Sequence, residues 1–224
     1  MVSHRISKVD NLVPIRSGIV TVSDKSGLEP FVSKLADLCA ELALYSTGGT
    51  YRTLSGIPGL EGCVHEVSEY TGQPETQGGL VKTLDYRIYL GVLGERYNEA
   101  HVEDRRRTGS LLFDLVVVNL YPFADTVARG DTDVEAARSN IDIGGPTLIR
   151  AAAKNFPRVA VVCDPADYEP VIDELASSGG ALSLDTRFGL AQKAFGHVAE
   201  YDRAIDEYLS GVSREQVDAV YGGV

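Results

Sequence analysis

Short apolar runs alternate with amphipathic stretches along much of the chain. Residues 17–22, 42–45, 115–120 and 159–163 consist mainly of β-branched and other apolar side chains, and each run has the length of a buried strand. Between the first two runs, residues 28–39 repeat apolar side chains at helical spacing. This order of strand, loop and helix predicts an α/β fold in which helices cover a parallel sheet.

The second half of the chain is expected to be richer in helix. Polar residues 133–140 and alanine-rich residues 147–154 predict two helices, separated by a turn at residues 142–146. Residues 166–177 and 186–209 predict two further helices. No internal repeat or linker interrupts this pattern, so we expect one domain with a helical C-terminal part.

The ends of the chain set the expected domain limits. Residues 1–16 mix charges with single apolar side chains and are expected to form a loose N-terminus. The domain should cover residues 17–209, and residues 210–224 should form a C-terminal tail. The N-terminus lacks the continuous apolar core of a signal peptide, and no later run is long enough to cross a bilayer. We therefore expect no membrane partner.

Charge and cysteine content narrow the functional classes. The 224 residues carry 32 acidic and 21 basic side chains, a formal net charge of -11, which disfavours binding to nucleic acid. Cys39, Cys63 and Cys163 are odd in number and scattered, so they fit neither a disulfide framework nor a zinc site. We expect reduced thiols in a cytoplasmic protein whose core, with 44% hydrophobic residues, needs no metal.

A glycine-containing turn and a lysine are candidates for phosphate binding. Residues 46–50 read Ser-Thr-Gly-Gly-Thr between a predicted strand and a predicted helix, where backbone amides and hydroxyls can surround an anion. Lys25 follows another strand at what should be the same edge of the sheet, and it could neutralise the same charge. Taken singly, a structural turn and a solvated loop lysine are the simpler explanations.

Three further charged residues are candidates for ligand contact. Lys82 lies in an apolar, glycine-rich segment, where a buried ammonium needs a nearby anion to keep its charge. Asp142 stands on a turn before two glycines whose amides can also bind a ligand, and Lys154 ends the alanine-rich helix. The ordinary structural explanations are a helix cap for Asp142 and a helix-dipole contact for Lys154.

Several segments together resemble one protein family. In chain order they are residues 22–28, 46–50, 67–72, 81–84, 119–123 and 140–155. With these segments and residues 190–208, the chain is similar to the IMP cyclohydrolase half of the bifunctional purine-biosynthesis protein, AICAR transformylase/IMP cyclohydrolase. The likeness runs from about residue 17 to about residue 209. The transformylase half is expected to be absent.

The resemblance implies a three-layer, methylglyoxal-synthase-like fold and a homodimer. It also implies an enzyme that closes a formylated aminoimidazole carboxamide ribonucleotide to IMP with loss of water, without a metal or organic cofactor. Contacts to this phosphorylated ribonucleotide carry over to Ser23, Lys25, Ser46, Thr47, Gly48, Gly49, Thr83, Ile143 and Gly144. The catalytic group carries over to Lys82, Tyr121, Asp142 and Lys154.

The chemistry of ring closure gives the catalytic group its expected roles. A carboxamide nitrogen is a weak nucleophile, so its proton must be removed while charge on the formyl oxygen is stabilised and the reacting atoms are held together. We expect Asp142 to act as the base and Tyr121 as a positioning donor. Lys82 and Lys154 are expected to be cationic stabilisers.

One segment departs from the family pattern. Where the family reads Gly-Arg-Val-Lys-Thr-Leu-His-Pro with a later histidine, this chain has Leu80, Asp85, Tyr86 and Tyr89 in place of arginine, His-Pro and the later histidine. The loss of arginine removes a bidentate contact, and aspartate replaces a possible donor with an acceptor. We interpret these changes as a hint of an altered substrate.

Three functions remain open from the sequence. They are a stand-alone IMP cyclohydrolase, a paralogue that closes the ring of a modified nucleotide in specialised, nucleoside-type metabolism, and a noncatalytic nucleotide-sensing domain. Retention of Lys82, Tyr121, Asp142 and Lys154 argues against the third, because a sensor needs a phosphate site but no base. Methylglyoxal synthase activity is disfavoured, because residues 119–123 and 142–154 follow the cyclohydrolase pattern.

Overall fold

Five parallel strands form the central sheet, in the order β4-β3-β2-β5-β6. The computed structural model describes residues 5–73, 82–128, 130 and 132–222. The strands are β2 (Ser17–Thr21), β3 (Ala43–Ser46), β4 (Val64–Glu66), β5 (Leu115–Val118) and β6 (Ala160–Val162). All residues of β5 and β6 are buried, which explains their unbroken apolar sequence, since helices cover both faces.

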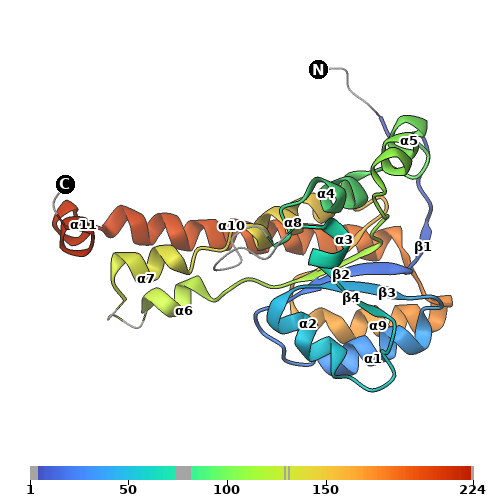
Figure 1. Cartoon of the computed structure of the whole chain (residues 1–224), viewed down its shortest axis with the longest axis horizontal. Helices are drawn as coiled ribbons and strands as arrows, with labels where there is room; N and C mark the ends of the chain where they lie inside the picture. Colours follow the sequence, from blue (N-terminus) through green and yellow to red (C-terminus); the bar gives the residue numbers. More distant parts are fainter. Residues whose placement is uncertain (1–4, 74–81, 129, 131, 223–224) are drawn as a thin grey trace.

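Helices cover the sheet on both sides, which gives three layers (Figure 1). On one side lie α1 (Leu28–Leu38), α2 (Gly48–Ser55) and α9 (Tyr168–Ser178). On the other side lie α4 (Tyr86–Leu93), α8 (Gly144–Lys154) and α10 (Leu184–Gly211). The predicted α/β class, with a helical C-terminal part, is confirmed.

The remaining elements extend this body. They are α3 (Val67–Thr71), α5 (Glu99–Thr108), α6 (Phe123–Ala128), α7 (Val134–Ser139), α11 (Arg214–Tyr221) and the 3-10 helix η2 (Pro165–Asp167). Helix α10 runs past the sheet, and α6, α7 and α11 lie along its projecting end (Figure 1). None of the helices in the described ranges is both long and apolar enough to span a bilayer.

The order of the strands decides where a ligand can bind. The chain adds β3 and β4 on one side of β2 and then crosses to add β5 and β6 on the other. Thr21 at the end of β2 pairs with Val118 at the end of β5, and Ser46 ends β3 beside Val20. The loops that leave β2, β3 and β5 therefore begin at one edge, where open α/β sheets bind their ligands.

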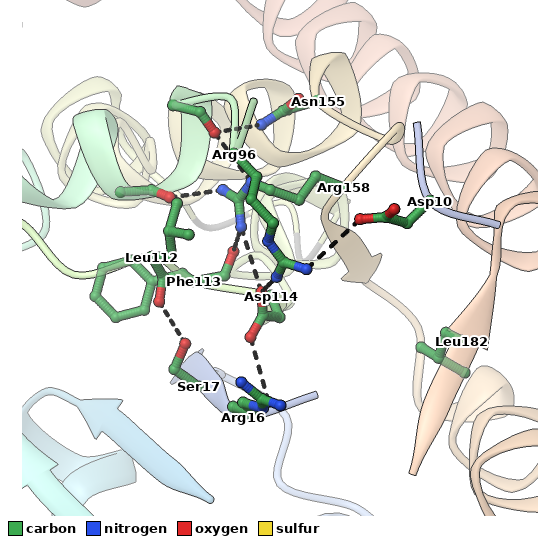
Figure 2. A network of polar contacts seen from close by, with 12 residues as sticks. Asp10, Arg16, Ser17, Arg96, Leu112, Phe113, Asp114, Asn155, Arg158 and Leu182 are labelled. Carbon is green, nitrogen blue, oxygen red and sulfur yellow. Dashed lines mark hydrogen bonds and ion pairs between the residues drawn. The ribbon is translucent and has the colours of Figure 1, made fainter. Parts of the chain in front are cut away.

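The opposite, amino edge of the sheet is closed by a buried polar network (Figure 2). Asp114 lies 3.4 Å from Arg158 and 3.5 Å from Arg96, and it accepts a hydrogen bond from the backbone of Arg16. Arg158 also donates to four main-chain carbonyl groups. Burial raises the pKa of Asp114 and lowers the pKa of Arg158 to about 10, against the attraction between the two charges.

The two ends of the chain are more ordered than the sequence pattern suggested. Leu12–Pro14 forms β1, which pairs antiparallel with β7 (Ala181–Ser183), and Val13 and Ile15 are each 1% exposed. The expected loose N-terminus is therefore wrong for these residues. The expected tail contains α11, whose Tyr221 donates a 2.6 Å hydrogen bond to Glu135 on α7. The capping box of Ser213 and Gln216 is the local sequence signal for α11.

Candidate functional site

A cavity of about 500 Å³ opens at the carboxyl edge of the sheet. It is bounded by the ends of β2, β3 and β5, by residues 82–84 and by residues 139–145. The predicted site residues that line it are Ser23, Lys25, Thr47, Gly48, Gly49, Lys82, Thr83, Tyr121, Asp142, Ile143 and Gly144. Lys82 and Asp142 thus face one cavity, although 60 positions of sequence separate them.

The N-terminus of α2 makes one end of the cavity suitable for an anion. Thr47 is the N-cap residue of α2, but its side chain accepts no hydrogen bond from the first backbone amides of the helix. These amides can therefore donate to a ligand. A Cβ atom built on Gly49 would lie 4.0 Å from the Lys25 Nζ, and one built on Gly48 would lie 3.0 Å from the Lys82 Nζ. Two ammonium groups therefore flank a helix N-terminus, an arrangement that favours a phosphate group.

Thr50 and Asn119 hold the loops that form this end. Thr50 donates to and accepts from the main chain of Val22, which ties α2 to the end of β2. The Asn119 Oδ1 accepts from the backbone amides of Ser23, at 2.6 Å, and Asp24, at 3.0 Å, and its Nδ2 donates to the Asp24 carbonyl. Asn119 lines the cavity and was missed as a site residue, although a polar side chain directly after the most apolar strand was a visible signal.

Asp142 lies beside the N-terminus of a second helix, α8. Its Oδ1 accepts a 2.9 Å hydrogen bond from the backbone amide of Gly145. Burial raises the pKa of Asp142 above its ordinary value, and hydrogen bonds from Gly145 and Gly144 oppose this rise. A carboxylate with a raised pKa and a fixed position has the properties of a general base.

Residues 82–83 connect the anion end of the cavity to Asp142. A Cβ atom on Gly144 would lie 3.0 Å from the Thr83 Oγ1, so this side chain touches the start of α8. Lys82, the preceding residue, lies against the start of α2. Tyr121 and Ile143 are 55% and 61% exposed at the cavity wall, so both side chains are accessible to a bound ligand.

Two predicted site residues do not reach this cavity. Ser46 is fully buried, and its Oγ donates to the Val20 carbonyl at 2.6 Å, so it joins two strands. Lys154 lies in the last turn of α8, ten residues after Gly144, which corresponds to about 15 Å along the helix. The expected ligand contact of the Ser46 side chain is therefore wrong at this cavity, while the expected role of Lys154, which is exposed outside the lining, stays a prediction.

Three of the residues that depart from the family pattern fall in the described part of the chain, and none of these three is in the cavity lining. Asp85 is the N-cap of α4, where its carboxylate accepts from the Arg87 backbone and from the Gln73 side chain, both at 2.7 Å. Tyr86 is exposed on the same helix, and Tyr89 packs against the core, where burial raises the pKa of its hydroxyl to about 12. Leu80 lies outside the described residues. Asp85 and Tyr89 therefore make their contacts within the protein, at the start of α4 and against the core.

The cavity holds groups for binding an anion and for moving a proton. Over the part of the chain that the structure describes, no group of three or more His, Cys, Asp or Glu side chains is placed to hold a metal ion. The cysteines are free thiols, and Cys39 and Cys163 are buried. The lining groups are instead two lysines, one carboxylate, a phenol, hydroxyls and the backbone amides of two helix starts.

Fold and cavity define an α/β protein with a cavity at the switch point of a parallel sheet, lined by groups that suit an anion. Residues 27–147 match the family described as the MGS-like domain, and residues 152–222 match the family described as the AICARFT/IMPCHase bienzyme. The chain belongs to the MGS-like domain family. The resemblance stated from the sequence motifs is confirmed by the two matches together.

Similar proteins are found over most of the chain. Two relatives, each named bifunctional purine biosynthesis protein PurH, come from Neisseria meningitidis serogroup A / serotype 4A and serogroup C / serotype 2a. Each is 46% identical over 201 residues, which cover 89% of this chain and 37% of the relative. The chain thus spans well under half the length of these relatives. A solved structure, "Crystal structure of ForH", is 32% identical with a TM-score of 0.71, and the match covers 86% of this chain and 98% of that chain.

Proposed function

We propose that this chain is an IMP cyclohydrolase-type enzyme that closes the ring of a formylated aminoimidazole carboxamide ribonucleotide. The single observation that carries the proposal is that Asp142 and Lys82 line one cavity with the uncapped N-terminus of α2. The match to the AICARFT/IMPCHase bienzyme and the likeness to the two PurH proteins support the same chemistry. The phosphorylated ribonucleotide as substrate and a second copy of the chain as partner remain predictions.

In the proposed complex, the phosphate lies at the start of α2. The backbone amides of Gly48 and Gly49 donate to it, and Lys25 and Lys82 balance its charge, because both ammonium groups flank these glycines. Ser23 and Thr47 line the same end and offer further hydroxyl donors. The base ring then extends toward Asp142 and Tyr121, at the other wall of the cavity.

Ring closure moves two N–H protons to the formyl oxygen, which leaves as one water molecule. Asp142 takes the proton from the carboxamide nitrogen as this nitrogen bonds to the formyl carbon. The formyl oxygen gains negative charge, which Tyr121 and the backbone amide of Gly144, both in the cavity lining, can stabilise. The proton taken by Asp142 then converts this oxygen into a hydroxyl group. The hydroxyl group leaves as water with the proton of the formamido nitrogen, and the ring closes without any redox change.

Asp142→Asn tests the proposal, because it keeps the shape of the side chain and the acceptor for Gly145 but removes the base. With the formylated ribonucleotide as substrate, kcat for IMP formation should fall by about 10²-fold or more, while binding of IMP changes little. Asp206→Asn, which alters an exposed carboxylate on α10, is the matched control. Unchanged turnover in Asp142→Asn would remove this residue from the mechanism, and no IMP above the spontaneous rate in the wild type would overturn the function.

A paralogue that acts on a modified nucleotide is the second candidate, because Leu80, Asp85, Tyr86 and Tyr89 depart from the family pattern, although the three that the structure describes do not line the cavity. Because Asp85 caps α4, its effect on a substrate would have to be indirect. A comparison of kcat/KM between the ordinary formylated ribonucleotide and analogues with an altered ring separates the two candidates. A preference for the analogue would identify the paralogue.

A further inference from the structure

The Tyr201 hydroxyl makes a direct contact with the main chain of Asp142. Tyr201 lies on α10 and is 9% exposed, and its hydroxyl accepts a 2.7 Å hydrogen bond from the Asp142 backbone amide. The same hydroxyl lies 3.5 Å from the carbonyl oxygen of Asn140, to which it can donate. One phenol therefore satisfies both a donor and an acceptor of the segment that carries the carboxylate.

Helix α10 is held against α8 at both ends of their contact. Near the start of α10, the fully buried Arg187 donates to the carbonyl groups of Phe156 and Pro157, just after α8. Fourteen residues later, Tyr201 binds Asp142, which lies fourteen residues before Phe156. Because both separations are fourteen residues, the two antiparallel segments are matched in length between these contacts.

An aromatic contact also places Tyr201 next to the segment that carries Tyr121. Phe123 packs edge-on against Tyr201, with ring centroids 6.3 Å apart, and against Tyr208 at 5.9 Å. Phe123 follows Tyr121 by two residues, and its amide donates to the Tyr121 carbonyl at 2.8 Å. Helix α10 thus supports the segments of both Tyr121 and Asp142, although it lies outside residues 27–147, which match the MGS-like domain.

We propose that Tyr201 is a positioning residue for the ring-closing reaction, because its hydroxyl fixes the peptide group from which the Asp142 carboxylate extends. This inference rests on the proposed function of Asp142. The Gly145 amide holds one carboxylate oxygen, and Tyr201 holds the backbone behind it, so the direction of the carboxylate is set from two sides. Without the hydroxyl, the Asp142 amide loses its acceptor at a half-buried site, and the carboxylate should sample unproductive directions.

Tyr201→Phe removes one oxygen atom and keeps the ring that packs on Phe123. We expect kcat to fall about 5- to 10-fold with KM within about twofold of the wild type, since the loss corresponds to one hydrogen bond and leaves the phosphate end intact. Tyr208→Phe is the matched control, because it removes a hydroxyl from the same helix and the same aromatic cluster without touching Asp142. Its kcat should stay within about twofold of the wild type.

A double-mutant cycle separates positioning from a general structural effect. In the Asp142→Asn background, Tyr201→Phe should cause no further loss of kcat, because there is no base left to position. An equal loss in both backgrounds, or a Tyr201→Phe kcat within twofold of the wild type, would overturn the inference.

Hydrogen exchange tests the contact independently of the reaction. If the wild type forms no IMP, the proposed function fails, but exchange of the Asp142 amide still reports on Tyr201. This exchange should be at least about fivefold faster in Tyr201→Phe than in the wild type or in Tyr208→Phe. Unchanged exchange would overturn the inference whatever the activity is.

Discussion

Two opposing influences act on the ionisation of Asp142. Burial raises its pKa, because the charged carboxylate loses water, and the amides of Gly145 and Gly144 lower it by donating to the charged form. Burial is the larger of the two. Such a carboxyl group accepts a proton more readily than an exposed aspartate, which suits the role proposed for it.

The pH dependence of turnover should report this raised pKa. Since only the ionised form can accept the proton, kcat should fall as the pH decreases through the pKa of Asp142. The acid limb of the profile should therefore lie above pH 3.8, the ordinary value for an aspartate. Steady-state rates across the stable pH range measure this limb, and a limb at or below the ordinary value would contradict the assignment.

The free energy of unfolding should also depend on the ionisation of Asp142. Protonation, which removes the base and lowers kcat, should favour the folded state. A carboxyl group whose pKa is raised by folding favours the folded state when protonated, and this contribution is lost as the pH rises through the folded pKa. Asp142→Asn should therefore be no less stable than the wild type at neutral pH. A loss of activity in this variant then cannot be attributed to unfolding.

Single residues varied in how far the sequence alone revealed their roles. Lys25, Lys82 and Asp142 were predicted because charged groups beside glycines or strand ends indicate ligand contact, and all three line the cavity. Ser46 belongs to the same motif, but the side-chain alternation of β3 turns it inward to Val20. For Asp85, the role as a helix cap depends on where α4 begins, which its charge alone does not indicate.

At the scale of the elements, glycines within helices have contrasting surroundings. A Cβ atom on Gly189, on the exposed side of α10, would meet no atom within 4 Å. A Cβ atom on Gly91, in α4, would lie 2.3 Å from the Leu111 carbonyl oxygen and 2.8 Å from the Phe113 ring. One position therefore tolerates a side chain, and the other requires its absence.

Gly189→Ala should raise the free energy of unfolding by about 0.5–1 kcal/mol, because alanine restricts the unfolded chain and favours helix. Gly91→Ala is the contrasting variant and should lower it by about 1–3 kcal/mol through overpacking. Urea denaturation of both variants measures the difference. A destabilised Gly189→Ala would mean that the exposed side of α10 has a neighbour in solution.

The predicted elements matched the structure better in their type than in their limits. Helix α8 begins at Gly144, within residues predicted as a turn, and α2 begins at Gly48 rather than at Tyr51. Glycine indicates a turn by local preference, but the Asp142 carboxylate caps the Gly145 amide, and Pro146 in the first helical turn needs no amide partner. The residues at which α8 and α2 begin therefore depend on specific contacts, which the turn preference of glycine does not take into account.

At the scale of the whole molecule, the network around Asp114 connects distant parts of the chain. Arg158, two residues before β6, lies against Asp114, directly before β5 (Figure 2). It also donates to carbonyl groups in and after α4, such as that of Gly91. Arg96 links the same carboxylate to Asp10 near the N-terminus. The network closes the amino edge of the sheet, opposite the cavity.

Arg158→Met should lower the free energy of unfolding by roughly 3–5 kcal/mol, because it leaves the Asp114 carboxylate and several carbonyl groups without their buried donor. Arg106→Met, which breaks an exposed pair with Glu103 on α5, is the control and should change it by less than about 1 kcal/mol. Thermal or urea unfolding gives both values. Equal effects would show that the buried network contributes no more than a surface pair.

The α/β class, the central strands and the motifs of the cavity follow from the sequence. Hydrophobic periodicity is local, and residues of one motif stay together wherever the chain folds. Other features needed the folded chain: the common cavity of Lys82 and Asp142, the exclusion of Lys154 from it, and the contact between Tyr201 and Asp142. They depend on strand order and on the packing of α10 against α8, which bring together atoms far apart in sequence, and no local pattern specifies such distances.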